Sequence, residues 1–184
     1  MLNIALTGVS GYADTHYQEL MRRCRNGEIH IIGAAVINQK DEEEKCRNLK
    51  SCGCEVFSGF NEMLDKLKGR IDLCFIPTGI ALHAPMAIAA MKAGANVCIE
   101  KPAAATVQEI NDMRKAEKEC DKFTAVGFQS FYLPEIIKIR SLIASGRIGK
   151  LISVRGIGIS PRTKSYYTRN NWVGKIKNNG MWVL

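Results

Sequence analysis

Three residues that can do chemistry stand directly after an apolar run: Glu100, Lys101 and Pro102 follow residues 96–99. A carboxylate and an ammonium group at the carboxyl end of a buried strand can face the crevice in which open α/β sheets bind their ligands. Whether these charges face a ligand therefore depends on whether the rest of the chain builds such a sheet. A surface salt bridge between Glu100 and Lys101 is the simpler alternative.

The segment GVSGYA, residues 8–13, separates a first apolar run from a helix-like segment. Gly8 allows a tight turn, Ser10 is small enough for the backbone to approach phosphates, and Ala13 lets helix and strand pack closely. Ser10 and Ala13 depart from the strict G-x-G-x-x-G pattern. Between a strand and a helix, the segment predicts a site for the pyrophosphate of a dinucleotide. An ordinary turn is the alternative.

The end of the second apolar run bears on which dinucleotide is bound. An acidic residue at this place accepts hydrogen bonds from the adenine-ribose 2′-hydroxyl, but the sequence has Asn38 there, followed by Gln39 and Lys40. Asn38 can bond a hydroxyl without repelling a 2′-phosphate, and Lys40 can pair with such a phosphate. Both NAD and NADP therefore stay open, and a solvated loop is the alternative.

Pro77 and Thr78 follow a further apolar run, residues 71–76. A proline at this place ends the strand and can turn the chain along a cofactor, to which Thr78 offers a hydroxyl. His83 falls at the start of the next helix-like segment, where a histidine taken alone is more typical of a helix end than of a catalyst.

The elements that must position these residues alternate regularly between strand and helix. A chain of this kind predicts a doubly wound parallel sheet, the α/β Rossmann architecture. Thr106, with Glu109 three residues later, predicts a capping box at the start of the last helix. The expected strands cover residues 2–6, 29–37, 54–57, 71–76, 96–99 and 123–126, and the expected helices cover 12–26, 40–50, 61–68, 81–93 and a segment after residue 106.

Beyond this region the pattern changes. A helix is expected over residues 134–144, and alternating apolar residues over 151–159 predict the first strand of a second, α+β sheet domain. One strand cannot bury itself, so either its partner strands come from another chain or this second domain is truncated, and we expect the truncation. The expected domains are residues 1–128, which bind NAD(P), and residues 129–184, which begin a substrate and oligomerisation domain.

Composition and charge narrow the classes of protein to which the chain can belong and the partners that we expect for it. No apolar run approaches the roughly 20 residues of a membrane helix, and no signal-peptide pattern is visible, so we expect a cytoplasmic protein without a membrane partner. Seven scattered cysteines indicate reduced thiols rather than disulfides or a metal site. The net charge of +8 belongs to the last part of the chain, where ten Lys and Arg residues and no acidic residue follow Glu135. This part lacks dense basic runs, so we expect no nucleic-acid partner.

Several segments, in their order and spacing, resemble the glucose-fructose oxidoreductase and inositol dehydrogenase family (Gfo/Idh/MocA). They are Pro77-Thr78, His83, Ala93-Gly94, Val97 and Glu100-Lys101-Pro102, with support from residues 8–13 and 126–151. The resemblance implies that Glu100 bonds ribose hydroxyls near the nicotinamide. It also implies that Lys101 points toward substrate and is catalytic, by hydrogen-bonding a substrate hydroxyl or assisting proton transfer. Family members pair this lysine with an Asp and a His of a D-x-G-x-H-like segment, which the chain does not show before Leu184. The motifs and the resemblance together give these cofactor-binding positions: Gly8, Ser10, Gly11, Tyr12, Asn38, Pro77, Thr78, His83, Glu100, Lys101 and Gln129.

The leading hypothesis is an NAD(P)-dependent oxidoreductase that transfers a hydride between a sugar or polyol hydroxyl and a nicotinamide, and that forms a homo-oligomer at full length. One alternative is a redox-neutral, NAD-using enzyme that processes glycosides. Another is a non-catalytic nucleotide-binding module. A polar and aromatic set near the end of the chain is expected to reach a sugar: Arg162, Tyr166, Tyr167, Arg169, Asn170 and Trp172.

Overall fold

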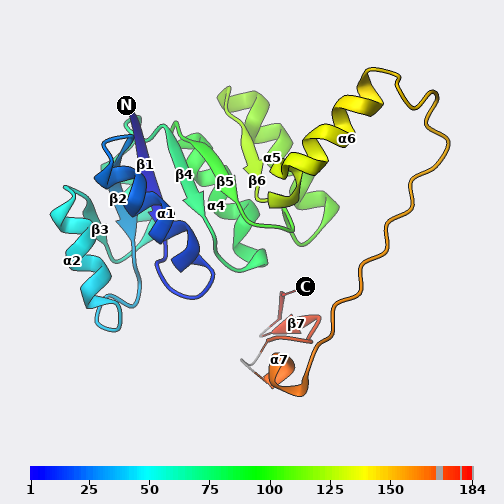
Figure 1. Ribbon diagram of the computed structural model, residues 1–184. Coiled ribbons are helices and arrows are strands. Elements are labelled where there is room, and N and C mark those ends of the chain that lie inside the picture. The colour runs from blue at the N-terminus through cyan, green and yellow to red at the C-terminus, as the bar shows by residue number, and fades with distance from the viewer. Residues whose placement is uncertain (169–171, 179, 184) are drawn as a thin grey trace. The chain divides into compact units, whose positions relative to one another are not determined.

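The computed structural model of the chain describes residues 1–168, 172–178 and 180–183. Its main feature is a six-stranded sheet with helices packed against it (Figure 1). The strands of this sheet are β1 (Leu2–Thr7), β2 (Ile29–Ala35), β3 (Glu55–Phe57), β4 (Leu73–Ile76), β5 (Asn96–Ile99) and β6 (Thr124–Val126). The connecting helices are α1 (Ala13–Arg25), α2 (Glu43–Ser51), α3 (Phe60–Lys66), α4 (Ile80–Lys92) and α5 (Val107–Cys120).

The sheet is parallel and doubly wound, as the sequence predicts. Its strand order is β3-β2-β1-β4-β5-β6, and every neighbouring pair runs parallel. The order reverses between β1 and β4, because the chain first moves outward through β2 and β3 and then returns to the other side of β1. This reversal is the topological switch point at which open α/β sheets bind ligands.

Two apolar clusters fill the two faces of the sheet. In one, Tyr17, Leu20 and Met21 of α1 pack with β1, β2 and α2. In the other, α3, α4 and α5 pack with β4 and β5, and α4 contributes Ala84, Ala87, Ala90 and Met91. Small alanines at helical spacing let α4 approach the sheet closely. These two cores hold the carboxyl ends of the strands in fixed positions.

The capping box expected at the start of α5 is confirmed. The side-chain oxygen of Thr106 accepts a hydrogen bond of 3.2 Å from the backbone N–H of Glu109, and the Glu109 carboxylate accepts one of 3.0 Å from the backbone N–H of Thr106. Each residue therefore satisfies a backbone donor that the first helical turn leaves free.

The chain forms two compact units, Met1–Gly127 with Ile176–Leu184, and Phe128–Lys175. The second unit contains a 3₁₀ helix, η1, with the helices α6 and α7, and a short antiparallel pair, β7 and β8, follows it. Their bounds are η1 (Gln129–Tyr132), α6 (Pro134–Ala144), α7 (Lys164–Thr168), β7 (Lys177–Asn178) and β8 (Met181–Trp182).

The strand expected over residues 151–159 is a correction, because the structure assigns this segment to no strand. Side chains of both parities are exposed there: Ile152 is 93% exposed and Ile157 is 75% exposed. Alternation predicts a strand only when a neighbour pairs with its backbone and a core covers one face. The described residues provide neither for this segment.

All seven cysteines are free thiols, as the sequence indicates. Among the described residues, none of the helices combines the length and the apolar character that crossing a membrane requires.

Candidate functional site

Four segments of the first unit meet at the carboxyl edge of the sheet. The glycine-rich segment follows β1, Thr78 follows β4, Glu100 and Lys101 follow β5, and Gly127 follows β6. Because the strands are parallel, these segments lie along one edge, on both sides of the switch point between β1 and β4. Apart from His83, which lies within α4, the sequence-predicted positions from residue 8 to residue 101 therefore lie in the turns along this edge, where open α/β sheets form their ligand crevice.

The glycine-rich segment has the conformation that its sequence indicates. Gly8 and Gly11 have φ angles of 77° and 60°, a region that residues with a Cβ rarely adopt. The backbone N–H of Gly8 donates to Ala35 O at 2.8 Å, which ties the segment to the end of β2. Ser10, Gly11 and Tyr12 are exposed where α1 begins. Backbone N–H groups at such a helix start can bind an anion.

Lys45 of α2 contacts the glycine-rich segment directly, and sequence reasoning missed this residue. Its ammonium group donates to Val9 O at 2.7 Å, to Asp14 Oδ1 at 2.8 Å and to Glu42 Oε2 at 3.0 Å. Three acceptors match the three N–H groups of a lysine. The hydrogen bond from Lys45 lowers the pKa of Asp14, and the same bond raises the pKa of Lys45. The lysine joins the glycine-rich segment, α1 and the start of α2.

Asn38 lies half-buried in the turn between β2 and α2. Its backbone oxygen accepts hydrogen bonds from the N–H groups of Asp41 at 3.0 Å and Glu42 at 3.2 Å, which fixes the turn. The next residue, Gln39, donates to Ser58 Oγ at 3.2 Å. Lys40 is exposed, and four consecutive carboxylates follow it in residues 41–44. The surroundings of Asn38 are therefore more acidic than the sequence interpretation assumed.

Pro77, Thr78 and His83 form a compact group after β4. We expected His83 to line the crevice, but its side chain is 1% exposed and lies between two backbone carbonyls. Its Nδ1 is 2.9 Å from Pro102 O and its Nε2 is 3.1 Å from Thr78 O. A neutral imidazole has one N–H, so only one of these contacts is then a hydrogen bond. Either way, His83 ties the turn after β4 to the turn after β5.

Thr78 also supplies a test of whether a ligand fits. Its Oγ1 is shielded from solvent and has no hydrogen-bond partner among the described residues. A buried hydroxyl without a partner costs free energy, and a ligand in the crevice can satisfy it. With the exposed glycine-rich segment, this orphaned hydroxyl fits a dinucleotide that runs along the edge from β1 to β4.

Glu100 and Lys101 differ sharply in exposure. Glu100 is 9% exposed, whereas Lys101 is exposed, and the Lys101–Pro102 bond is cis. Glu100 Oε1 lies 2.9 Å from Nε2 of His16, a residue of α1 that sequence reasoning also missed. An exposed lysine thus directly follows a carboxylate that His16 contacts, and an exposed ammonium group can bind hydroxyl groups and exchange a proton.

The remaining predicted positions lie in the second unit or outside the described residues. Gln129 begins η1 and is exposed. In the expected sugar-contacting set, the guanidinium of Arg162 lies 4.4 Å from the ring centroid of Tyr166. Arg169 and Asn170 fall outside the described residues.

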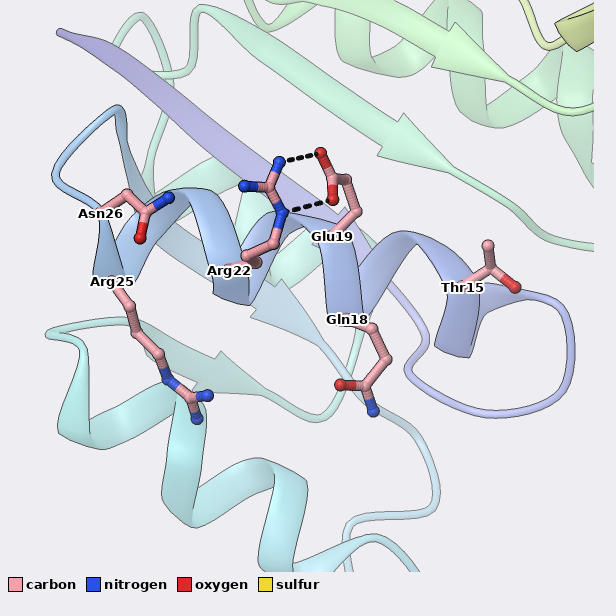
Figure 2. Close-up of a pocket in the computed structure, with 6 residues that line it drawn as sticks. All are labelled: Thr15, Gln18, Glu19, Arg22, Arg25 and Asn26. Atoms are coloured by element: carbon pink, nitrogen blue, oxygen red, sulfur yellow. Dashed lines mark hydrogen bonds and ion pairs between the residues drawn. The ribbon is translucent and has the colours of Figure 1, made fainter.

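A shallow hollow on the outer face of α1 is distinct from the crevice. Figure 2 shows the residues that line it: Thr15, Gln18, Glu19, Arg22, Arg25 and Asn26. Arg22 donates to both oxygens of Glu19, at 2.9 Å and 2.8 Å, and this pairing lowers the pKa of Glu19 to about 2. Glu19 also accepts a hydrogen bond from Arg23 at 2.7 Å, so this single carboxylate serves two guanidinium groups.

The fold and the crevice define a dinucleotide-binding α/β protein. The model of the Gfo/Idh/MocA oxidoreductase family, with its NAD-binding Rossmann fold, matches residues 2–128. The chain belongs to this family, as the motifs around Glu100 and Lys101 suggest.

Three comparisons illustrate the similarity. Inositol 2-dehydrogenase of Azotobacter vinelandii is 29% identical over 154 residues, which are 81% of this chain and 43% of that protein. An NAD binding oxidoreductase from Klebsiella pneumoniae is 28% identical, with a TM-score of 0.67 over 80% of this chain and 40% of that chain. A levoglucosan dehydrogenase in complex with NADH and levoglucosan is 26% identical, with a TM-score of 0.67 over 81% of this chain and 40% of that chain. The chain thus spans less than half the length of each.

Proposed function

We propose that the chain is the cofactor-binding part of an NAD-dependent oxidoreductase that acts on a sugar or polyol hydroxyl. The observation that supports this most is the meeting of the glycine-rich segment with the Glu100-Lys101 turn at the switch point. The similarity to inositol and levoglucosan dehydrogenases supports the substrate class. In this proposal, residues 1–128 bind the cofactor, residues 129–184 begin the substrate domain, and the full-length protein is a cytoplasmic homo-oligomer.

Each part of the crevice has a role in this proposal. The backbone of the glycine-rich segment binds the pyrophosphate, Asn38 binds the adenine ribose, and Thr78 supplies a hydroxyl near the centre. When bound, the nicotinamide dinucleotide supplies the acceptor or donor of the hydride. Lys101 then hydrogen-bonds the substrate hydroxyl and handles its proton, while Glu100 orients the ribose beside it. Gln129 is proposed to contact the nicotinamide side of the site.

The acidic run after Asn38 leads us to favour NAD over NADP. A 2′-phosphate carries nearly two negative charges near neutral pH, and the carboxylates of residues 41–44 lie in the adjoining turn and the first turn of α2. Lys45 is already paired with Asp14 and Glu42, which leaves Lys40 as the nearest cation in the turn. We expect NADPH to bind about tenfold more weakly than NADH.

Titration of the purified chain with NADH and NADPH, by calorimetry or NADH fluorescence, tests the cofactor part. Saturable binding with NADH preferred supports the proposal. The absence of binding to a chain that unfolds cooperatively would refute it. Equal affinity for the two dinucleotides would refute the NAD preference alone.

Turnover on a panel of polyols and sugars, followed by NADH absorbance, tests the catalytic part. In a form that turns over, Lys101→Ala should lower kcat by two or more orders of magnitude, whereas substitution of the exposed Lys92 should leave kcat unchanged. An unchanged kcat in Lys101→Ala would refute the proposed catalytic role of Lys101. Substrate conversion without net NADH release would support the redox-neutral alternative, and cofactor binding without any turnover would support a non-catalytic module.

A further inference from the structure

The Glu100 carboxylate lies in an enclosed place. Its side chain is 11% exposed, and its Oε1 lies 2.9 Å from His16 Nε2. The backbone N–H of Lys101 reaches the other oxygen, Oε2, over a longer 3.4 Å. An enclosed carboxylate is costly unless a polar group pairs with it. His16 therefore provides the stronger of the two contacts that fix this side chain.

Gly127 forms a wall on another side of the same carboxylate. A Cβ atom at this position would lie 2.7 Å from Glu100 Oε1, 3.1 Å from Cδ and 3.2 Å from Oε2. The backbone of Gly127 is itself fixed, because its N–H donates to Ile99 O at 2.8 Å. The carboxylate thus occupies the space that a side chain at residue 127 would need, and His16 determines which way it points.

The His16 ring is itself held in place by two aromatic neighbours. Its centroid lies 5.7 Å from that of Phe75, on β4, and 6.0 Å from that of Tyr12, at the start of α1. The interplanar angles are 52° and 70°, so the rings meet tilted or edge to face. With the ring oriented in this way, Nε2 stays directed at Glu100.

The contact between His16 and Glu100 also spans the edge of the sheet at which a cofactor would bind. His16 belongs to α1, which follows β1, whereas Glu100 follows β5, and β4 lies between β1 and β5 in the sheet. The contact therefore runs over the carboxyl end of β4, beside the switch point. A dinucleotide that extends from the glycine-rich segment toward Lys101 must pass this contact.

We propose that His16 is a positioning residue, which holds Glu100 in the orientation that binds a ribose of the dinucleotide. This inference rests on the proposed function of the crevice. His16 occupies Oε1, so Oε2, with its one long contact, keeps accepting capacity for ribose hydroxyls. Without His16 the carboxylate turns toward solvent, and binding must restore its orientation each time.

The test measures NADH affinity and urea unfolding for variants that separate the donor from the ring. In His16→Gln, the terminal amide takes the place of Nε2 and still donates. In His16→Asn, the same amide is too short to reach Glu100, and in His16→Phe the aromatic contacts remain but the donor is lost. His30→Gln, at an exposed position of β2, is the matched control.

The expected result is a rescue pattern. The His16→Asn and His16→Phe variants should bind NADH about tenfold or more weakly than the unmodified chain. The affinities of His16→Gln and His30→Gln should stay within about threefold of it. Unchanged affinity in both Asn and Phe variants would overturn the inference, and so would a Gln variant as weak as Asn. If the His16→Phe variant does not unfold cooperatively, the comparison of His16→Gln with His16→Asn alone tests the inference. If the unmodified chain binds no NADH, the proposed function fails rather than the role of His16.

Discussion

Replacing Lys45 by methionine should loosen the glycine-rich segment without opening the core. Methionine keeps the aliphatic stem, which passes near the Tyr17 ring, but it removes the ammonium group 5.7 Å from that ring centroid. Three acceptors then lose their donor: Val9 O, the Asp14 carboxylate and the Glu42 carboxylate. The backbone carbonyl matters most, because it belongs to the segment expected to bind the pyrophosphate.

The size of the effect follows from these contacts. A hydrogen bond from a charged group contributes about 1.5–3 kcal/mol when well shielded, and an exposed ion pair contributes about 0.2–1 kcal/mol. The Lys45 side chain is 25% exposed and its partners Asp14 and Glu42 are 40% and 17% exposed, so we discount the first figure for solvent. We expect Lys45→Met to lower the free energy of unfolding by about 1–2.5 kcal/mol, which is about 0.5–1 M in the urea midpoint.

Lys66 provides a matched control for this experiment. Its ammonium group also lies 5.7 Å from an aromatic centroid, that of Phe57, and also pairs with a carboxylate, that of Glu55. However, Lys66 is 61% exposed, and its pair does not touch the crevice segments. Lys66→Met should therefore change the free energy of unfolding by less than about 1 kcal/mol and should leave NADH affinity unchanged.

The assay combines urea unfolding with NADH titration of the same samples. We expect Lys45→Met to weaken NADH binding about three- to tenfold, in addition to its effect on stability, because the glycine-rich segment loses a fixed contact. Equal urea midpoints for Lys45→Met and Lys66→Met would refute the reasoning on stability. A destabilised Lys45→Met variant with normal NADH affinity would show that Lys45 supports the fold but not the binding segment.

Three further predictions concern the crevice, acid pH and the thiols. Gly127→Ala should keep the urea midpoint within about 0.5 M, because the flexible end of Glu100 can move aside, yet it should weaken NADH binding about tenfold; a normal affinity would contradict the wall described for Gly127. The pKa of Asp14 is lowered in the folded chain by its bond to Lys45, so this carboxylate stabilises the fold above its ordinary pKa and the contribution is lost as the pH falls through the lowered value. Melting temperatures from pH 7 to pH 3 should thus fall less in Lys45→Met than in the unmodified chain, and parallel curves would contradict the linkage. Burial raises the pKa of Cys54 and Cys74 to about 12. At pH 8, alkylation followed by mass spectrometry should therefore label these two thiols only after the chain unfolds. Rapid labelling of either thiol in the native chain would contradict their burial.

Much of the sheet could be predicted from the sequence because its strands are short apolar runs between clear helices and turns. The apolar runs at 96–99 and 71–76 predict strands, and β5 and β4 lie there. Parallel strands put the residues after them on one edge, so the grouping of Gly8, Thr78 and Glu100 followed from strand order alone. The strand expected at 151–159 was wrong because alternation describes one face of a ladder and cannot supply the partner strand.

The contacts inside the crevice could not be predicted in the same way. His16 and Glu100 are 84 residues apart in the sequence, and Lys45 is 36 residues from Val9. Polar residues at helix positions carry no local mark that distinguishes a long-range contact from a solvated surface. His83 shows the same limit, because its place near the start of α4 was expected but the direction of its ring depends on two turns that pack around it.

The strand order described above also has a consequence for how the chain becomes competent to bind. β1 meets β2 early during synthesis, but β4 joins β1 only after roughly seventy residues have been made, as the pairing of Ile4 with Leu73 requires. Contacts between distant segments form slowly because chain entropy opposes them. The carboxyl edge that carries the glycine-rich segment, Thr78 and Glu100 is therefore complete only after β4 and β5 have joined β1 in the sheet, so a chain cut before residue 73 would keep only the part of this edge that β1, β2 and β3 form.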